Sequence, residues 1–387
     1  MQSVDLEHTV ERVRDVVRDV IAPAAEAIDA DARWPAEGLA ALLDAGLGGL
    51  VVPTEYGGLG LGAVGLLRVG EVLGSACPST ALCFGMHCVA AATIAADASP
   101  WQVDNFLKPI VAGDHLTTLA LSEPGTGAHF WMPTTTLDAT DGALHANGTK
   151  SFVTNGGRAD SYVVSTVDAD PLAPPGSFSC LVIAADAPGL RWDGEWTGMG
   201  MRGNSSRTLH LDDVTVPADA LLGRVGDEIR YVFGVIAPYF LVAMSGTYLG
   251  IAQSAMNTAV DHLQHRSHVH TARTLADSPV IQHHVGRLWA IVARSRQLAL
   301  HAAEGTDSGR ADALPALCAS KADIAEAVVE VVNESMTLAG GLAYRDGSAL
   351  HRNLRDARAA HIMSPTTDLL RIWTGRVALG RPLLGEL

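Results

Sequence analysis

Few residues in this sequence combine acid–base chemistry with a spacing that would let them act together. Asp368 lies two residues after Thr366, about half a helical turn further on, so its carboxylate could face a pocket or cap the helix that starts after Pro365. Capping is the more common role at such a position. His129 follows the turn sequence GTGA, and histidine is the side chain that most often transfers protons in enzymes, which makes it a second candidate for proton transfer.

Three histidines, His262, His265 and His268, fall at helical spacing and could together bind a metal ion. They drift around the helix, however, and the pattern gives them no carboxylate partner. His283 and His284 are adjacent, so their side chains point in different directions. We therefore expect no metal site.

The composition limits the class of protein. The chain has 387 residues, of which 48% are apolar and 18% charged, so we expect a packed globular protein with more than one domain. A net charge of −15 argues against nucleic-acid binding. We expect no membrane span, because we read every apolar run as interrupted by Glu, Arg or Asp. A charged N-terminus without a signal-like apolar core, together with five cysteines that form no CxxC pair, favours a cytoplasmic location.

Hydrophobic periodicity divides the chain into three regions. Residues 1–115 carry apolar residues at helical spacing, which predicts helices that include 37–48 and 63–95. Residues 116–225 change to short β-branched or aromatic runs separated by turn sequences, which predicts an antiparallel, barrel-like β-domain. In residues 226–387 the helical period returns, over segments 228–269, 279–304, 311–339, 350–363 and 366–380. The pattern predicts a mostly α-helical protein with an inserted β-domain.

Four motifs, in order, resemble those of the acyl-CoA dehydrogenase superfamily. They are LALSEPGTGAHF (119–130), KSFVTNGGRAD (150–160), MGMRGNSSRTLHLDDVTVP (199–217) and AGGLAYRDGSALHRNLRDAR (339–358). That superfamily has an N-terminal helical domain, a middle β-barrel-like domain and a C-terminal four-helix bundle. The resemblance covers nearly the whole chain and implies an FAD-dependent oxidoreductase that acts on an acyl thioester, carried by CoA or by a carrier protein.

The resemblance also implies which residues bind FAD. Hydroxyls and backbone N–H groups of the two turns in the middle domain would contact the flavin, and Phe152 replaces the tryptophan that covers its ring. Arg266 and the glycine pair after the long helix would reach the FAD of a neighbouring subunit, because glycine allows close backbone approach. The expected cofactor contacts are Leu119, Leu121, Ser122, Phe152, Thr154, Arg266, Gly340, Gly341, Thr366 and Asp368.

These residues also have alternative, purely structural roles. The hydroxyl residues could cap turns, Phe152 could belong to the core, Arg266 could be a solvated surface residue, and Gly340 with Gly341 could end a helix. The sequence leaves both interpretations open.

The sequence departs from the superfamily at the catalytic base. Members remove an α-proton with a glutamate that stands either at the position of Ser364 or, in a subset, at the position of Phe240; neither residue here can take a proton at pH 7. Leu241 replaces the arginine that follows the second position. The catalytic residue is therefore unassigned, with Asp368 and His129 as candidates, and the expected substrate-site residues are Ala128, Phe240 and Leu241.

Three functions remain open from the sequence. The first is oxidation of an acyl thioester with an atypical or absent base, with an electron acceptor as partner. The second is a flavin-dependent monooxygenase on the same fold, supplied by a reductase. The third is a non-catalytic or non-redox subunit of a hetero-oligomer. The resemblance implies a homodimer or homotetramer, but Thr337 and the RSHVH segment (266–270) depart from the superfamily's cross-subunit contacts, which keeps a hetero-oligomer open.

Overall fold

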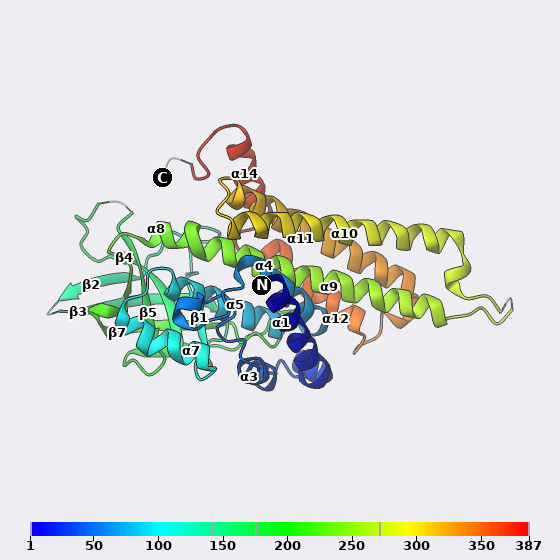
Figure 1. Ribbon diagram of the computed structural model, residues 1–387, viewed down its shortest axis with the longest axis horizontal. Helices are drawn as coiled ribbons and strands as arrows, with labels where there is room; N and C mark the ends of the chain where they lie inside the picture. The colour runs from blue at the N-terminus through cyan, green and yellow to red at the C-terminus, as the bar shows by residue number, and fades with distance from the viewer. Residues whose placement is uncertain (1, 141, 175, 271, 386–387) are drawn as a thin grey trace.

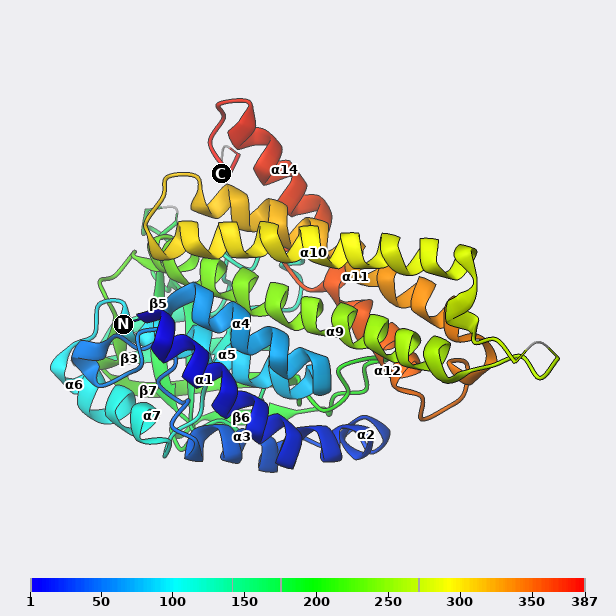
Figure 2. The same ribbon diagram turned by 45° about the vertical axis from the view of Figure 1, so that its right-hand side comes forward.

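The computed structural model describes residues 2–140, 142–174, 176–270 and 272–385. Figure 1 shows an elongated molecule with the β-sheet at one end. Three long helices, α9 (Ala237–His265), α10 (Pro279–Asp307) and α11 (Ala313–Ala339), run from the sheet towards the other end. The N-terminal helices lie beside α9, and α14 (Thr367–Ala378) projects from the bundle in both views (Figures 1 and 2).

The N-terminal region is helical up to the first strand. Its elements are α1 (Gln2–Val16), a π-helical turn (Val17–Ile21), α2 (Ala22–Ala30), α3 (Ala36–Asp44), a 3₁₀ turn (Thr54–Tyr56), α4 (Gly62–Ala76), α5 (Pro78–Ala95), α6 (Pro100–Gln102), a second π-helical turn (Val103–Leu107) and α7 (Lys108–Ala112). Every residue of α5 is buried, so this helix is the centre of the core. Cys77 is extended and separates α4 from α5, because a proline at the next position favours a helix start.

The middle region forms one eight-stranded sheet in the described residues. The strands are β1 (Thr117–Ala120), β2 (Thr136–Thr140), β3 (Ala143–Val153), β4 (Ser161–Asp168), β5 (Phe178–Ala184), β6 (Leu190–Asp193), β7 (Arg207–Pro217) and β8 (Leu221–Leu222). Their order is β6-β7-β3-β2-β4-β5-β8, with β1 paired to β4 outside this path. Most pairs are antiparallel, but β1 and β2 both pair with β4 in parallel, so the expectation of a purely antiparallel domain is wrong in this detail.

The C-terminal region begins with α8 (Glu228–Tyr231) and a π-helical turn (Val232–Ile236) that leads into α9. After α11 come α12 (Ala349–Ala357), α13 (Ala359–Ile362) and α14. α9 packs against α4 at a close crossing made by glycines. A Cβ on Gly74 of α4 would lie 2.4 Å from the carbonyl oxygen of Thr247, and one on Gly250 of α9 would lie 2.3 Å from that of Glu71. These glycines let the N-terminal helices lie directly on the bundle.

Most of these elements agree with the sequence predictions. The mostly helical fold with an inserted sheet is confirmed, and the C-terminal helices lie close to their predicted ranges. Strands β2 and β8 were not predicted, and the predicted helix 63–95 is two helices. All five cysteines are buried with free thiols.

The prediction that no apolar run is long enough to cross a membrane is wrong. Two helical segments, Pro78–Ala95 and Glu228–His265, are long and apolar enough by composition. The first is fully buried and the second 72% buried inside the protein over the apolar window, so both are core helices of the fold.

Candidate active site and cofactor site

The turn after β1 is held by a buried ion pair. The Glu123 carboxylate lies 2.6 Å from Lys150 Nζ, and both side chains are almost fully excluded from solvent. The carboxylate also accepts hydrogen bonds from the backbone N–H and hydroxyl groups of Thr134 and Thr135. Burial alone would raise the pKa of Glu123, but the ammonium group and these hydroxyls lower it to about 2. The expected contact Ser122 is half-buried and fixed to β3, because its carbonyl accepts the N–H of Ser151 at 2.8 Å.

The turn after β3 is fixed by Asn155, which has a left-handed backbone with φ of 59°. Its side chain accepts a hydrogen bond from Trp34 Nε1 and donates one to the carbonyl of Cys83, both at 3.0 Å. These bonds tie the turn to the N-terminal helices. Thr154 precedes it, with its carbonyl bound by Thr118 Oγ1 at 2.9 Å and its own hydroxyl 3.4 Å from Ser206 Oγ.

Phe152 projects from the surface at a bulge in β3. Its side chain is 70% exposed, its φ is 56°, and its ring meets Trp196 edge-on. An exposed phenylalanine at a backbone conformation that is unusual for a non-glycine residue is consistent with a site that a ligand covers, and it excludes the alternative that Phe152 belongs to the core. Of the other expected contacts, Leu119 is half-buried in β1 and Leu121 is buried just after it.

Ser364 and Phe240, the residues expected at the two base positions, are uncharged and lie in different surroundings. Ser364 donates a hydrogen bond from Oγ to the carbonyl oxygen of Ala128 at 3.0 Å, which joins the segment before α14 to the loop after the Glu123 turn. Phe240 is half-buried near the start of α9, and Leu241 is completely buried. The structure thus brings Ser364 and Ala128 together, and Leu241 belongs to the core.

The capping role belongs to Thr366 rather than to Asp368. Thr366 is the N-cap of α14 and its hydroxyl accepts from the N–H of Leu369 at 3.5 Å, whereas Asp368 is exposed in the first turn. A negative charge in the first turn interacts favourably with the partial positive charge at the N-terminus of the helix. His129 is also exposed; its Nδ1 lies 3.3 Å from the carbonyl of Thr126 and its ring packs edge-on against Trp131.

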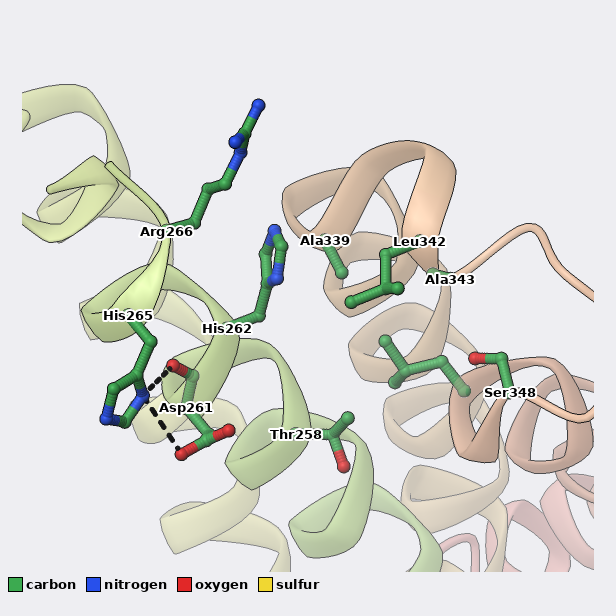
Figure 3. Close-up of a pocket in the computed structure, with 10 residues that line it drawn as sticks. Thr258, Asp261, His262, His265, Arg266, Ala339, Leu342, Ala343 and Ser348 are labelled. Atoms are coloured by element: carbon green, nitrogen blue, oxygen red, sulfur yellow. Dashed lines mark hydrogen bonds and ion pairs between the residues drawn. The ribbon is translucent and has the colours of Figure 1, made fainter. Parts of the chain in front are cut away.

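The far end of α9 forms one wall of a pocket of about 350 Å³. The other wall is the end of α11 and the turn that follows it, which contains the expected glycine pair. Figure 3 shows His262 rising into the space between the two walls and Arg266 extending above it, while His265 turns to Asp261, whose carboxylate it meets at 3.3 Å. That contact corrects the expectation that these histidines lack a carboxylate partner. The pocket is lined by Thr258, Asp261, His262, His265, Arg266, Ala339, Leu342, Ala343, Ser348 and Leu350.

The glycine pair fits both roles considered for it, which are to end α11 and to allow close approach of the backbone to a ligand. α11 ends at Ala339, and Gly340 caps it with φ of 62°. Both Gly340 and Gly341 are exposed, and a Cβ on either would meet no described atom within 4 Å. The pair therefore ends the helix and leaves an open backbone surface beside the pocket.

The two groups of expected cofactor contacts lie at opposite ends of the molecule. Phe240 and Arg266 are near the two ends of α9, and 26 residues of helix span roughly 39 Å. Figure 1 shows the sheet near the first end of α9, while the second end of α9 points away from it. The residues at this second end, including Arg266, line the pocket. One chain therefore cannot bring both groups to the same small molecule.

The RDAR segment connects all three regions, a role that the sequence did not reveal. Arg355 pairs with Asp29 of α2 and donates to the carbonyl of Met199 at 2.8 Å. The completely buried Asp356 accepts a hydrogen bond from the N–H of Met201 at 2.6 Å, and burial raises the pKa of Asp356 to about 6.

The sequence also did not reveal that Glu123 and Lys150 shape the site. One feature of the sequence could have indicated this pair: a charged residue within a buried strand or turn needs a partner of opposite charge.

The described residues fit FAD. The exposed Phe152 and the fixed turns offer an aromatic surface with hydroxyl and N–H donors, which suits a flavin ring. The distant pocket offers Arg266, His262 and open glycine backbone, which suits a phosphate-bearing group.

Comparisons with known proteins agree with this arrangement. Profiles for the N-terminal, middle and C-terminal domains of acyl-CoA dehydrogenases match residues 3–114, 118–214 and 242–379. A cyclohex-1-ene-1-carbonyl-CoA dehydrogenase of Geobacter metallireducens is 30% identical, over 96% of this chain and 97% of its own.

Solved structures show the same fold. A chain from work on the electron-transferring flavoprotein of Acidaminococcus fermentans has a TM-score of 0.92 at 25% identity, and butyryl-CoA dehydrogenase from Megasphaera elsdenii has a TM-score of 0.92 at 23% identity. Each match covers 97% of this chain and 98% of the other. The predicted family is confirmed: the chain belongs to the acyl-CoA dehydrogenase family of FAD-dependent oxidoreductases.

Proposed function

We propose that this protein oxidises an acyl thioester, carried by CoA or by a carrier protein, with a base other than the family's glutamate. The observation that carries the proposal is the fixed cofactor-side framework. Glu123 with Lys150 and Asn155 with Trp34 hold the two turns, and Phe152 projects beside them. A chain that had lost the cofactor would not need an exposed aromatic residue in a left-handed conformation at this place.

The reaction removes a proton from the α-carbon and a hydride from the β-carbon, and it leaves a 2,3-unsaturated thioester. Bound FAD supplies the hydride acceptor. We propose His129 as the proton acceptor, because it is the titratable residue next to Ala128, whose carbonyl is held by Ser364. Ser122, Thr154 and Thr366 would contact the flavin.

A second copy of the chain would complete the cofactor site. The flavin-side turns of one subunit and the Arg266 pocket of its partner would hold the two ends of one FAD, with Gly340 and Gly341 beside the dinucleotide. This arrangement would make a homodimer the smallest active unit. The similarity to a chain from work on an electron-transferring flavoprotein supports such a flavoprotein as the electron acceptor.

Anaerobic mixing of the flavin-loaded protein with saturated acyl thioesters tests the proposal. We expect the visible absorbance of the oxidised flavin to fall with at least one thioester in a panel of CoA and carrier-protein conjugates. No bleaching by any member of the panel, combined with oxygen consumption once a reductase supplies reduced flavin, would replace the proposal with a monooxygenase. No flavin turnover in either assay would indicate a non-redox subunit.

A further inference from the structure

Lys321 of α11 is completely buried and has no carboxylate partner in the described residues. Its Nζ donates hydrogen bonds to three backbone carbonyls, those of Ala360 at 2.8 Å, Met363 at 3.2 Å and Pro365 at 3.0 Å. An ammonium group has three N–H donors, so each donor has an acceptor. This contrasts with Lys150, the other fully buried lysine among the largest buried side chains, which pairs with Glu123.

All three acceptors belong to one short stretch of backbone, from α13 to the residue before the N-cap of α14. Burying an ammonium group is costly, and the cost is offset here only by these carbonyls. Burial lowers the pKa of Lys321 to about 7, while Cys318, one turn earlier on α11, acts to raise it; Lys321 in turn acts to lower the pKa of His361 on α13. The amino group therefore binds backbone carbonyls and forms no ion pair among the described residues.

The same stretch is attached on two other sides. Ser364 Oγ donates to the carbonyl of Ala128 at 3.0 Å, and the hydroxyl of the buried Tyr248 on α9 donates to Met363 Sδ at 3.3 Å. The backbone that carries the base position is thus held by the loop after the Glu123 turn, by α9 and by α11. Of these attachments, only Lys321 makes three hydrogen bonds.

We propose that Lys321 is a positioning residue that fixes the turn Met363–Thr366, so that Ser364 reaches Ala128 and Thr366 faces the cofactor. The part that concerns the cofactor rests on the proposed function. The part that concerns the turn does not, because it follows from the hydrogen bonds alone.

Lys321→Met tests the proposal, since it keeps the length of the side chain and removes all three donors. Leu288→Ala on α10 is the control for a general loss of stability, because Leu288 is buried and takes part in none of these hydrogen bonds. In hydrogen exchange of the flavin-loaded protein, we expect Lys321→Met to raise the exchange rate of the Met363 amide, which is bonded to the carbonyl of Ala359, at least tenfold over wild type. Leu288→Ala should raise exchange across the bundle without this local excess.

A second readout separates positioning from stability. We expect Lys321→Met to lower kcat for thioester oxidation at least tenfold with KM changed less than threefold, and to shift the visible spectrum of the bound flavin. Unchanged local exchange and spectrum, or a kcat that falls only with the folded fraction as in Leu288→Ala, would overturn the proposal. If Lys321→Met does not fold, Lys321→Gln takes its place in the comparison. Its amide group has two N–H donors, so it cannot bond all three carbonyls. If wild type oxidises no thioester, the exchange and spectral measurements still decide the role of Lys321 separately from the proposed function.

Discussion

The hydroxyl of Ser364 donates a hydrogen bond to the carbonyl oxygen of Ala128 at 3.0 Å. The sequence motifs predict that Ser364 replaces the catalytic glutamate of the family and that Ala128 lies in the loop beside the flavin. The serine therefore joins two parts of the expected site, and unlike a glutamate it carries no charge. The position expected for the base thus makes a defined structural contact.

Restoring the glutamate tests how much of the chemistry has been lost at this one position. Ser364→Glu combined with Pro365→Gly, introduced into the His129→Gln variant so that the proposed base is absent, should raise the rate of anaerobic flavin reduction by an acyl thioester by roughly 10²–10⁴, the usual contribution of a general base. Ser364→Ala, which removes the contact with Ala128 but adds no base, is the control. A glutamate variant that retains FAD and shows no increase would mean that other parts of the site have also changed.

His129 is the proposed proton acceptor, so its removal should be costly. His129→Gln should lower the rate of thioester oxidation by roughly 10²–10⁴ while FAD remains bound. His145→Gln is a matched control, because His145 is a partly exposed histidine on β3 that pairs with Asp213 away from the expected site. Equal rates for wild type and His129→Gln would exclude His129 and leave the proton acceptor to be found elsewhere.

The buried pair of Glu123 and Lys150 should be indispensable to the flavin-side turn. Lys150→Met leaves the carboxylate buried without its cation, which costs roughly 3–5 kcal/mol in the free energy of unfolding. Chemical denaturation and FAD titration should show lower stability and weaker cofactor binding. The double variant Glu123→Gln/Lys150→Met should lose less stability than Lys150→Met alone, because no unpaired charge remains. A larger loss in the double variant would show that the pair acts by more than charge compensation.

Glu228 should make the protein less stable as the pH rises. It is fully buried at the start of α8, neither carboxyl oxygen has a hydrogen-bond partner among the described residues, and burial raises its pKa to about 8. The folded state therefore keeps a proton that the unfolded chain has lost, so the stability from this group is complete below about pH 4.5 and decreases as the pH rises towards 8.

Glu228→Gln should remove this decrease and raise the free energy of unfolding at pH 7 by roughly 1–3 kcal/mol, as measured by denaturation at several pH values. Glu55→Gln, at an exposed position, should leave the pH profile unchanged. The same slope in wild type and Glu228→Gln between pH 5 and 8 would contradict the assignment.

Gly200 should tolerate no side chain. A Cβ there would lie 2.4 Å from the carbonyl oxygen of Arg355, at the contact between the middle and C-terminal regions. Gly200→Ala should lower Tm by several degrees, corresponding to roughly 1–3 kcal/mol. Gly286→Ala, at an exposed position of α10 where a Cβ meets nothing, should raise stability by roughly 0.5–1 kcal/mol, since alanine favours a helix. Similar thermal shifts for both variants would show that the close approach is not limiting.

Much of the fold could be predicted because hydrophobic periodicity is a local property of the sequence. The long helices of the bundle follow it closely. Strand β2 was missed because its TLDAT sequence is short and mostly exposed, so it lacks the apolar signal of a buried strand. The break between α4 and α5 was marked by Pro78, but the apolar run on both sides concealed it.

The site was predicted only where motifs carried it. The roles of Lys321, Asp356 and the Ser364–Ala128 contact depend on pairs that are far apart in the sequence, and periodicity contains no information about such pairs. The motif predicts Thr366 as a cofactor contact, whereas its capping of α14 became evident only from the backbone geometry. The distance between the flavin-side turns and Arg266 likewise depends on the uninterrupted length of α9.

The visible absorption spectrum of the purified protein, with the released chromophore identified after denaturation, tests the central claim most directly. We expect FAD at about one equivalent per subunit, or uptake of added FAD to that level, because the proposed dimer would offer two complete sites. A protein that contains no flavin and binds neither oxidised nor reduced FAD would contradict the account, since the fixed turns and the exposed Phe152 would then serve no cofactor.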